Sequence, residues 1–205
     1  MADNYKIQLE NAKQLYLNHD RKAIARRLSL KSDADALFID FLGENCRIDN
    51  RTGAVYYTES GQELGFKAAM SIYDYICRST PLPRSGGSKA PINSIQRNHP
   101  GVGENSYYKR FTEKFDADRE GFSEACIALG GKAYPRGDAA FTFTVFEGLE
   151  LTLQLWYSDE EFGANLTPLW DDHVLGLLMY ESAWYVCGYL LDCISAKMDE
   201  LKARS

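Results

Sequence analysis

The sequence contains few of the residues from which metal and cofactor sites are usually built. It has three histidines and five cysteines in 205 residues, and no two of its cysteines form a C-x-x-C pair. A centre of three histidines is therefore nearly excluded, and the cysteine pattern of an iron–sulfur site is missing. The motifs G-x-S-x-G, H-E-x-x-H and G-x-G-x-x-G are absent as well, so none of these nucleophile, zinc or dinucleotide motifs indicates an activity.

Basic residues are also fewer than acidic residues. The 23 lysines and arginines face 29 acidic residues, and the resulting net charge of −6 argues against unaided binding to nucleic acid or to an anionic membrane. Residues 1–13 lack the apolar core of a secretory signal, and the odd number of cysteines favours free thiols. We therefore expect a protein of the reducing cytoplasm.

The chain does have enough apolar material for a sizeable core. Hydrophobic residues make up 45% of it, and a chain of this mass buries about 70% of its unfolded surface. We predict a single domain over residues 1–205. Apolar residues recur at helical spacing in 7–16, 21–28, 64–77 and 106–129, and at strand spacing in 37–42, 46–57 and 140–155. These patterns predict an α+β fold, in which two antiparallel hairpins share one sheet packed against N-terminal helices and a long C-terminal helix.

Two local patterns refine this prediction. In the second hairpin, alternate residues should face the core, namely Leu149, Leu151, Leu153 and Leu155. In the helix over 21–28, the basic residues Arg21, Lys22, Arg26 and Arg27 alternate with apolar ones. We interpret these four as a solvated helix face rather than a binding surface.

Residues 79–105 form the least regular part of the sequence, with four of the six prolines and four glycines. We expect a long loop without regular structure, which in a compact domain is either a functional lid or a floppy segment. Its basic residues are Arg84, Lys89 and Arg97.

The segment Val174–Leu191 approaches the length of a membrane span and carries a single charge, Glu181. Polar and small residues fall on one side of it and continue beyond it, at positions 181, 188, 192, 195 and 199. This narrow polar stripe favours a buried helix of a soluble core over a membrane helix. Glu181 is then a buried carboxylate, which is either hydrogen-bonded or serves as a general acid or ligand anchor.

Acidic residues gather on both sides of residue 165. Asp159, Glu160 and Glu161 follow the leucine strand, and Asp171, Asp172 and His173 precede the long helix. One interpretation is structural, with Asp171 or Asp172 as the N-cap of that helix. The other is a site in which Asp171, Asp172 and His173 bind manganese, iron or magnesium.

The C-terminal third resembles a bacterial and archaeal family, the domain of unknown function 3786. The likeness is carried by the runs Leu155–Phe162, Leu169–Asp171 and Met179–Glu181, and earlier by Leu129–Gly131 and Gly137–Asp138. Family members have a strand ending in a D-E-E-F element, an apolar–aspartate step and a helix with a buried glutamate. They often have proline after the phenylalanine, where this chain has Gly163, and His173 is peculiar to this sequence.

The resemblance implies a domain found mostly in anaerobes and sometimes joined to iron–sulfur modules, with no established activity. A redox or iron–sulfur protein partner, or a tetrapyrrole cofactor (corrinoid or haem), is implied by that association alone.

These observations predict a cytoplasmic module that binds a small molecule or cofactor. The expected pocket is formed by Asp159, Glu160, Glu161, Asp171 and Glu181. The basic residues Arg84, Lys89 and Arg97 of the 79–105 loop are expected to face its acidic rim and close over it. Two alternatives stay open: a metal-dependent enzyme that uses the same carboxylates, and a structural protein that binds a larger partner. The sequence does not indicate the oligomeric state.

Overall fold

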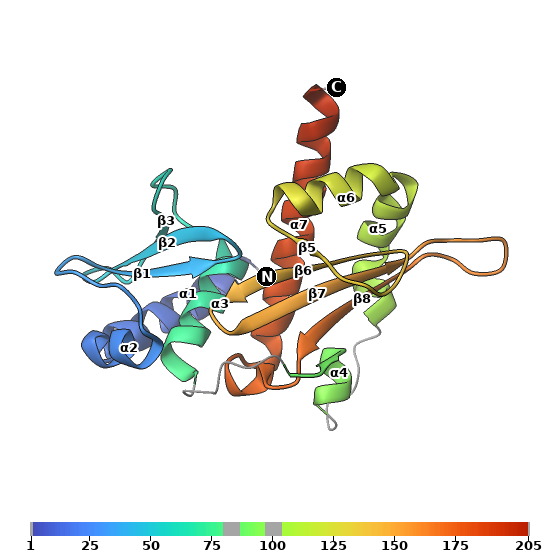
Figure 1. Cartoon of the computed structure of the whole chain (residues 1–205). Coiled ribbons are helices and arrows are strands. Elements are labelled where there is room, and N and C mark those ends of the chain that lie inside the picture. The colour runs from blue at the N-terminus through green and yellow to red at the C-terminus, as the bar shows by residue number, and fades with distance from the viewer. Residues whose placement is uncertain (1, 80–86, 97–103, 205) are drawn as a thin grey trace. The chain divides into compact units, whose positions relative to one another are not determined.

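A computed structural model describes residues 2–79, 87–96 and 104–204 and, within them, confirms the α+β class (Figure 1). The helices are α1 (Ala2–Leu17), α2 (Arg21–Leu28), α3 (Phe66–Arg78), α4 (Ile92–Ile95), α5 (Glu104–Ala117), α6 (Arg119–Ala128), the 3-10 turn η1 (Val174–Gly176) and α7 (Tyr180–Arg204). The strands are β1 (Ala36–Phe41), β2 (Glu44–Asp49), β3 (Val55–Tyr57), β4 (Lys89–Ala90), β5 (Lys132–Ala133), β6 (Ala139–Phe146), β7 (Leu149–Trp156) and β8 (Asn165–Asp171).

The chain divides into two compact units, which are described here one at a time. Unit 1 consists of Met1–Ser85 and His173–Val186, and unit 2 of Gly86–Asp172 and Cys187–Ser205. Helix α7 therefore contributes about its first two turns to unit 1 and the rest to unit 2. The single domain over residues 1–205 stays a prediction, because this division does not measure whether the units unfold together.

Unit 1 contains a three-stranded antiparallel sheet in the order β1-β2-β3. The predicted hairpin between β2 and β3 is confirmed: the Asp49 N–H donates to the Ala54 carbonyl at 2.9 Å, and Gly53 takes the left-handed conformation of the turn at φ +74°. Strand β1 joins the same sheet, with Ile39 opposite Cys46.

The predicted sharing of one sheet by the two hairpins is wrong, because the second hairpin lies in the sheet of unit 2. The sequence pattern marks strands but not their partners. Since β1 pairs with β2 and the unpredicted strand β8 pairs with β7, each hairpin completes a sheet of its own.

Helix α2 of unit 1 begins where local chemistry stabilises its first turn. Asp20 is the N-cap of α2, because its carboxylate accepts the backbone N–H groups of Lys22 and Ala23. Helix α3 is buried along most of its length, and Ile72 and Ile76 are fully covered. The α7 residues Ala183 and Val186 are also fully buried in this core.

Unit 2 contains a five-stranded antiparallel sheet in the order β4-β8-β7-β6-β5. The predicted orientation of the leucine strand is confirmed, because the following side chains are fully buried: Leu149, Leu151, Leu153 and Leu155. Three aromatic rings connect the sheet to α5 and α6, with Phe122 4.7 Å from Phe115 and 5.8 Å from Phe141 between ring centroids. These apolar contacts form the core of unit 2.

The polar stripe predicted on the long helix is present where that helix packs beside α5. Lys114 of α5 donates to the Ser195 hydroxyl at 2.8 Å and to Asp199 at 2.7 Å, and Arg110 contacts Asp192 at 3.2 Å. The stripe therefore has a structural role within unit 2. Among the helices of the described residues, none combines the length and apolar character that a membrane crossing requires.

The segment 79–105 has more structure than predicted. Within its described part, strand β4 pairs with β8, Lys89 opposite Asp171, and is followed by the short helix α4. The expectation of a loop without regular structure is therefore wrong for residues 89–95, because an edge of the sheet is available for pairing there. Arg84 and Arg97 lie outside the described residues.

Candidate functional site

The predicted acidic residues of the D-E-E-F element lie in the loop between β7 and β8, residues 157–164. The Asp159 carboxylate accepts the backbone N–H of Phe162 at 2.7 Å and that of Glu161 at 2.8 Å. These bonds, the one from Phe162 first, hold the pKa of Asp159 below its usual range. The Glu160 and Glu161 side chains are exposed. Asp159 thus shapes the loop rather than lining a cavity.

Asp171 lies at the last position of β8 and is buried. Its carboxylate contacts the Lys89 ammonium at 3.2 Å and accepts the Glu150 N–H at 3.0 Å. Burial acts to lower the pKa of Lys89, but the hydrogen bond to Glu150 and the charge of Asp171 outweigh it and raise that pKa. Lys89 therefore does face acidic groups as the sequence suggested, and the contact fastens β4 to the sheet.

The structure does not bring these two parts of the predicted pocket together. Strand β8 separates Asp159 from Asp171, and its seven residues, at about 3.4 Å rise each, span roughly 20 Å. The acidic residues that are close in sequence therefore lie at opposite ends of one strand.

The predicted N-cap role of Asp171 or Asp172 is wrong, because α7 begins only at Tyr180. Asp172 accepts the Ser88 hydroxyl at 2.9 Å, and His173 precedes the 3-10 turn η1. In the part of the chain that the structure describes, no group of three or more His, Cys, Asp or Glu side chains is arranged to hold a metal ion. The Asp171–Asp172–His173 metal site stays a prediction to which this geometry lends no support.

Glu181 is exposed, so the expectation of a buried glutamate is wrong. Because α7 begins at Tyr180, Glu181 lies in the first helical turn, where a carboxylate complements the positive end of the helix dipole.

The buried carboxylate of unit 1 is instead Asp74 of α3. It accepts the Met179 N–H at 2.5 Å at the start of α7, and burial raises its pKa against the opposing effects of Met179, Ser182 and Arg78. Sequence reasoning missed Asp74 because its partner is distant along the chain.

A second unpredicted feature is a polar hollow of unit 1, with a volume of about 970 Å³. Three segments line it: the α1–α2 junction, the loop before β1, and the turn after β2. The lining residues are His19, Asp20, Arg21, Lys22, Ser32, Asp33, Ala34, Asp35, Leu37, Asp49, Asn50 and Arg51. We refer to this feature as the hollow.

Asn50 holds the three segments together. Its side-chain oxygen accepts the Tyr16 hydroxyl at 2.9 Å, and its side-chain nitrogen donates to the Asp33 and Ala34 carbonyls at 3.4 and 3.3 Å. Its backbone carbonyl accepts the Arg21 guanidinium at 3.0 Å. These bonds connect the three segments that line the hollow.

Three of the four carboxylates in the hollow are engaged by the backbone. Asp20 caps α2, Asp33 accepts the Asp35 and Ala36 N–H groups, and Asp49 accepts those of Arg51 and Thr52. Hydrogen bonds from Thr52 hold the pKa of Asp49 below its usual range. These aspartates shape the turns.

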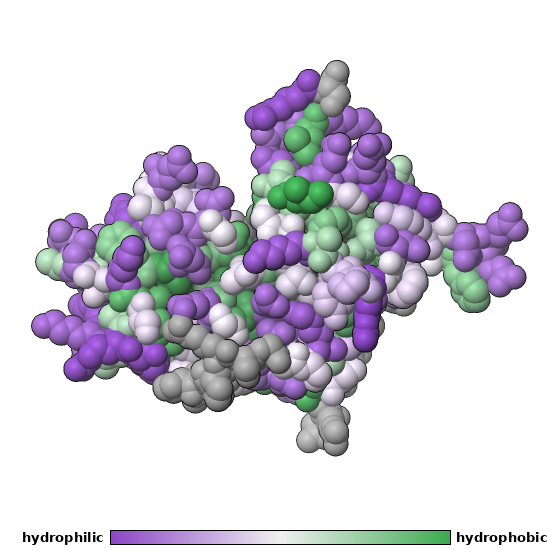
Figure 2. Space-filling model, in the orientation of Figure 1, coloured by the Kyte–Doolittle hydropathy of each residue, from purple (hydrophilic) through white to green (hydrophobic). Residues whose placement is uncertain are grey.

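The cations of the hollow are less committed. Lys22 and Arg51 are exposed, and among the described residues neither side chain makes a hydrogen bond or ion pair. Arg21 is half-buried and uses one nitrogen on Asn50. The prediction of a purely solvated face over 21–28 is thus wrong for Arg21, and also for Arg27, which donates to the Ile76 carbonyl. Figure 2 shows mainly hydrophilic residues on the surface over α2.

The lining has four carboxylates against three basic side chains, but three of the carboxylates accept backbone N–H groups, which leaves Lys22 and Arg51 as the groups that suit a small anion such as a carboxylate or phosphate. Two signals of it were visible in the sequence: the Asp20 cap before a basic helix, and the Asn50–Gly53 turn. Their meeting was not visible, because it depends on the pairing of β1 with β2.

Comparison with known proteins agrees with the resemblance seen in the sequence. The family profile described as "Domain of unknown function (DUF3786)" matches residues 20–192. No curated protein and no solved structure matches the chain. The matched range includes the β7–β8 loop and every lining residue of the hollow except His19.

Proposed function

We propose that this chain, which belongs to the DUF3786 family of domains of unknown function, binds a small anionic molecule in the hollow of unit 1. One observation carries the proposal. The walls of the hollow are fastened to one another through Asn50, while Lys22 and Arg51 at its edge make no ion pair among the described residues. A site whose chain is already ordered and whose cations are unpaired binds an anion without the entropy cost of ordering that chain.

The lining argues for a small polar ligand rather than a tetrapyrrole. Ten of the twelve lining residues are polar or charged, and only Ala34 and Leu37 are apolar. A corrinoid or haem exposes broad apolar ring faces, which require apolar walls. A carboxylate or phosphate is the better match to Arg21, Lys22 and Arg51 of the lining.

The first test is native mass spectrometry of the whole protein, purified without added ligand. A retained mass of up to several hundred daltons is expected, and it should be lost in the double variant Lys22→Ala/Arg51→Ala. A retained mass that survives in the double variant would place the ligand elsewhere and overturn the assignment to the hollow.

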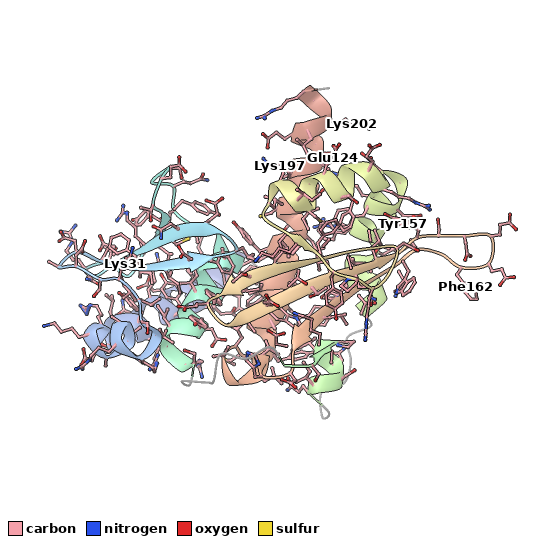
Figure 3. All side chains as sticks on the ribbon, viewed as in Figure 1. Lys31, Glu124, Tyr157, Phe162, Lys197 and Lys202 are labelled. Atoms are coloured by element: carbon pink, nitrogen blue, oxygen red, sulfur yellow. The ribbon has the colours of Figure 1, made fainter. Side chains whose placement is uncertain are left out.

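The second test uses two defined probes, inorganic phosphate and succinate, in calorimetric titrations at low ionic strength. The double variant should bind the better probe at least about tenfold more weakly, because even one lost charged contact of roughly 1.5–3 kcal/mol corresponds to a factor of about ten or more. Lys202→Ala, an exposed lysine near the end of α7 labelled in Figure 3, is the matched control and should bind as the parent does. If neither probe binds and no mass is retained, the protein is not an anion-binding module of this kind.

A further inference from the structure

The β7–β8 loop, residues 157–164, displays an aromatic side chain to solvent. Phe162 is 70% exposed, and Trp156 at the end of β7 is 48% exposed. Figure 3 shows the loop extending beyond the ends of its strands, with Tyr157 at its base and Phe162 toward its far end. In Figure 2 the same loop is hydrophilic apart from a hydrophobic patch. Of the large exposed apolar side chains, Phe162 is thus placed where a partner can reach it from several sides.

The loop is held in one shape although it projects. At its base, the Ser158 hydroxyl donates to Asp116 at 2.5 Å, and Arg119 donates to the Ser158 carbonyl at 3.1 Å while its guanidinium lies over the Tyr157 ring at 4.2 Å. At its tip, Asp159 accepts the Phe162 N–H. An aromatic side chain on a fixed loop loses little conformational entropy when it is bound.

The charged residues next to Phe162 in the tip of the loop are acidic. Glu160 and Glu161 are exposed beside it. The tip of the loop therefore favours a partner with surface lysines and arginines over nucleic acid or an anionic membrane.

We propose that the β7–β8 loop docks a basic protein, with Phe162 inserted into an apolar pocket of that protein and Glu160 and Glu161 placed against the lysines and arginines at its rim. The apolar anchor supplies affinity, as a central buried aromatic residue does in protein interfaces. The two glutamates supply orientation and speed of association, because charges at the rim of an interface act mainly on the association rate. The site is separate from the hollow, so it stands whether or not the hollow binds an anion.

The occupant is identified by placing a photoreactive phenylalanine analogue at position 162 of the full chain and irradiating it in a lysate of the source organism. A matched chain carries the analogue at Ile127, which is 63% exposed on α6 in the same unit. We expect one discrete protein adduct at position 162 and none at position 127. An adduct with a second copy of this chain, with nucleic acid or with lipid, or equal adducts at both positions, would overturn the proposal.

The cross-linked protein is then purified and its affinity for the unmodified chain measured. Phe162→Ala should raise the dissociation constant at least about tenfold, because truncation of an anchor residue typically has an effect of this size or larger. Glu160→Gln/Glu161→Gln should slow association and reduce its dependence on salt. Both variants should keep the parent's melting temperature. An unchanged affinity in Phe162→Ala would show that the adduct came from mere proximity.

Discussion

Two buried aspartates have different structural roles in this protein. Asp171 faces the Lys89 ammonium and keeps its charge paired. Asp74 accepts the Met179 N–H and contacts the Arg78 guanidinium at 3.2 Å, and burial nevertheless raises its pKa. Asp171 thus fastens strand β4 to the sheet, whereas Asp74 connects α3 to the start of α7.

For Asp171 we expect the charge to matter more than the shape. Asp171→Asn keeps an oxygen for the Glu150 N–H but leaves Lys89, whose side chain is 14% exposed, with Glu150 alone. The free energy of unfolding should fall by about 1.5–3 kcal/mol, measured by urea denaturation. The exposed neighbour Asp172 is the control, and Asp172→Asn should change it by less than about 0.5 kcal/mol. An unchanged urea midpoint in Asp171→Asn, combined with the loss of a bound ligand, would instead support the predicted site at this residue.

For Asp74 we predict a dependence of stability on pH. Because its pKa in the folded state is raised above the ordinary value of 3.8, the folded protein holds a proton that the unfolded chain has released. Its contribution to stability is full below pH 3.8 and is lost as the pH rises through the raised value. The stability of the parent relative to Asp74→Asn should therefore decrease from about pH 4 toward neutrality. Urea denaturation of both proteins across this pH range tests the prediction. A constant difference between their free energies of unfolding would contradict the raised pKa.

At the scale of elements, helix α2 is coupled to the hollow through its N-cap. Asp20 both caps the helix and adds a negative charge to the lining. Asparagine caps helices about as well as aspartate, whereas alanine costs about 1 kcal/mol. The two roles of Asp20 are thus separable by substitution.

Asp20→Asn should bind inorganic phosphate more tightly than the parent, because it removes a like charge from the lining and keeps the cap. Its free energy of unfolding should stay within about 0.5 kcal/mol of the parent, whereas Asp20→Ala should lose about 1 kcal/mol. Asp118→Asn, at the N-cap of α6 in unit 2, should leave phosphate binding unchanged. Weaker phosphate binding in Asp20→Asn would argue against anion binding in the hollow. Titration calorimetry and urea denaturation measure both effects.

Elements with local signals could be predicted from the sequence, and those that depend on distant partners could not. The hairpin over residues 46–57 and the alternation of Leu149–Leu155 each depend on residues close together in sequence, and each was predicted. Strand β8 was missed, and so was the start of α7, because pairing with β7 and capping by Asp74 are contacts across the fold.

The same distinction explains why the structure separates residues of the predicted site. Closeness in sequence suggested that Asp159 and Asp171 share a pocket, but an extended strand separates residues that a loop would bring together. Glu181 was expected to be buried because its neighbours are apolar, yet its place in the first turn of α7 exposes it.

At the scale of the whole molecule, α7 belongs to both units. Its residues Tyr180–Val186 complete unit 1 and the remainder completes unit 2. Neither unit is formed from one continuous stretch of chain. We therefore expect the two units to lose their structure in one cooperative transition, as the predicted single domain requires.

Gly188→Pro tests this expectation, because Gly188 lies in the interior of α7. Proline there removes a helical hydrogen bond and should cost about 3 kcal/mol or more. Hydrogen exchange measured by mass spectrometry should show an equal loss of amide protection in β1–β3 and in β6–β8. Ala203→Pro, in the last turn of the helix, is the control and should affect only that turn. A loss confined to one sheet would indicate two independent domains.

The interleaved path of the chain also sets an order of events during synthesis on the ribosome. When Ser85 has emerged, unit 1 still lacks the segment His173–Val186. At about 5–20 residues per second, the ribosome needs roughly 5–20 s to supply it. During that interval the part of α3 that contacts α7, at Phe66 and Asp74, stays uncovered. The hollow, although encoded near the start of the chain, becomes part of a finished unit only late in translation.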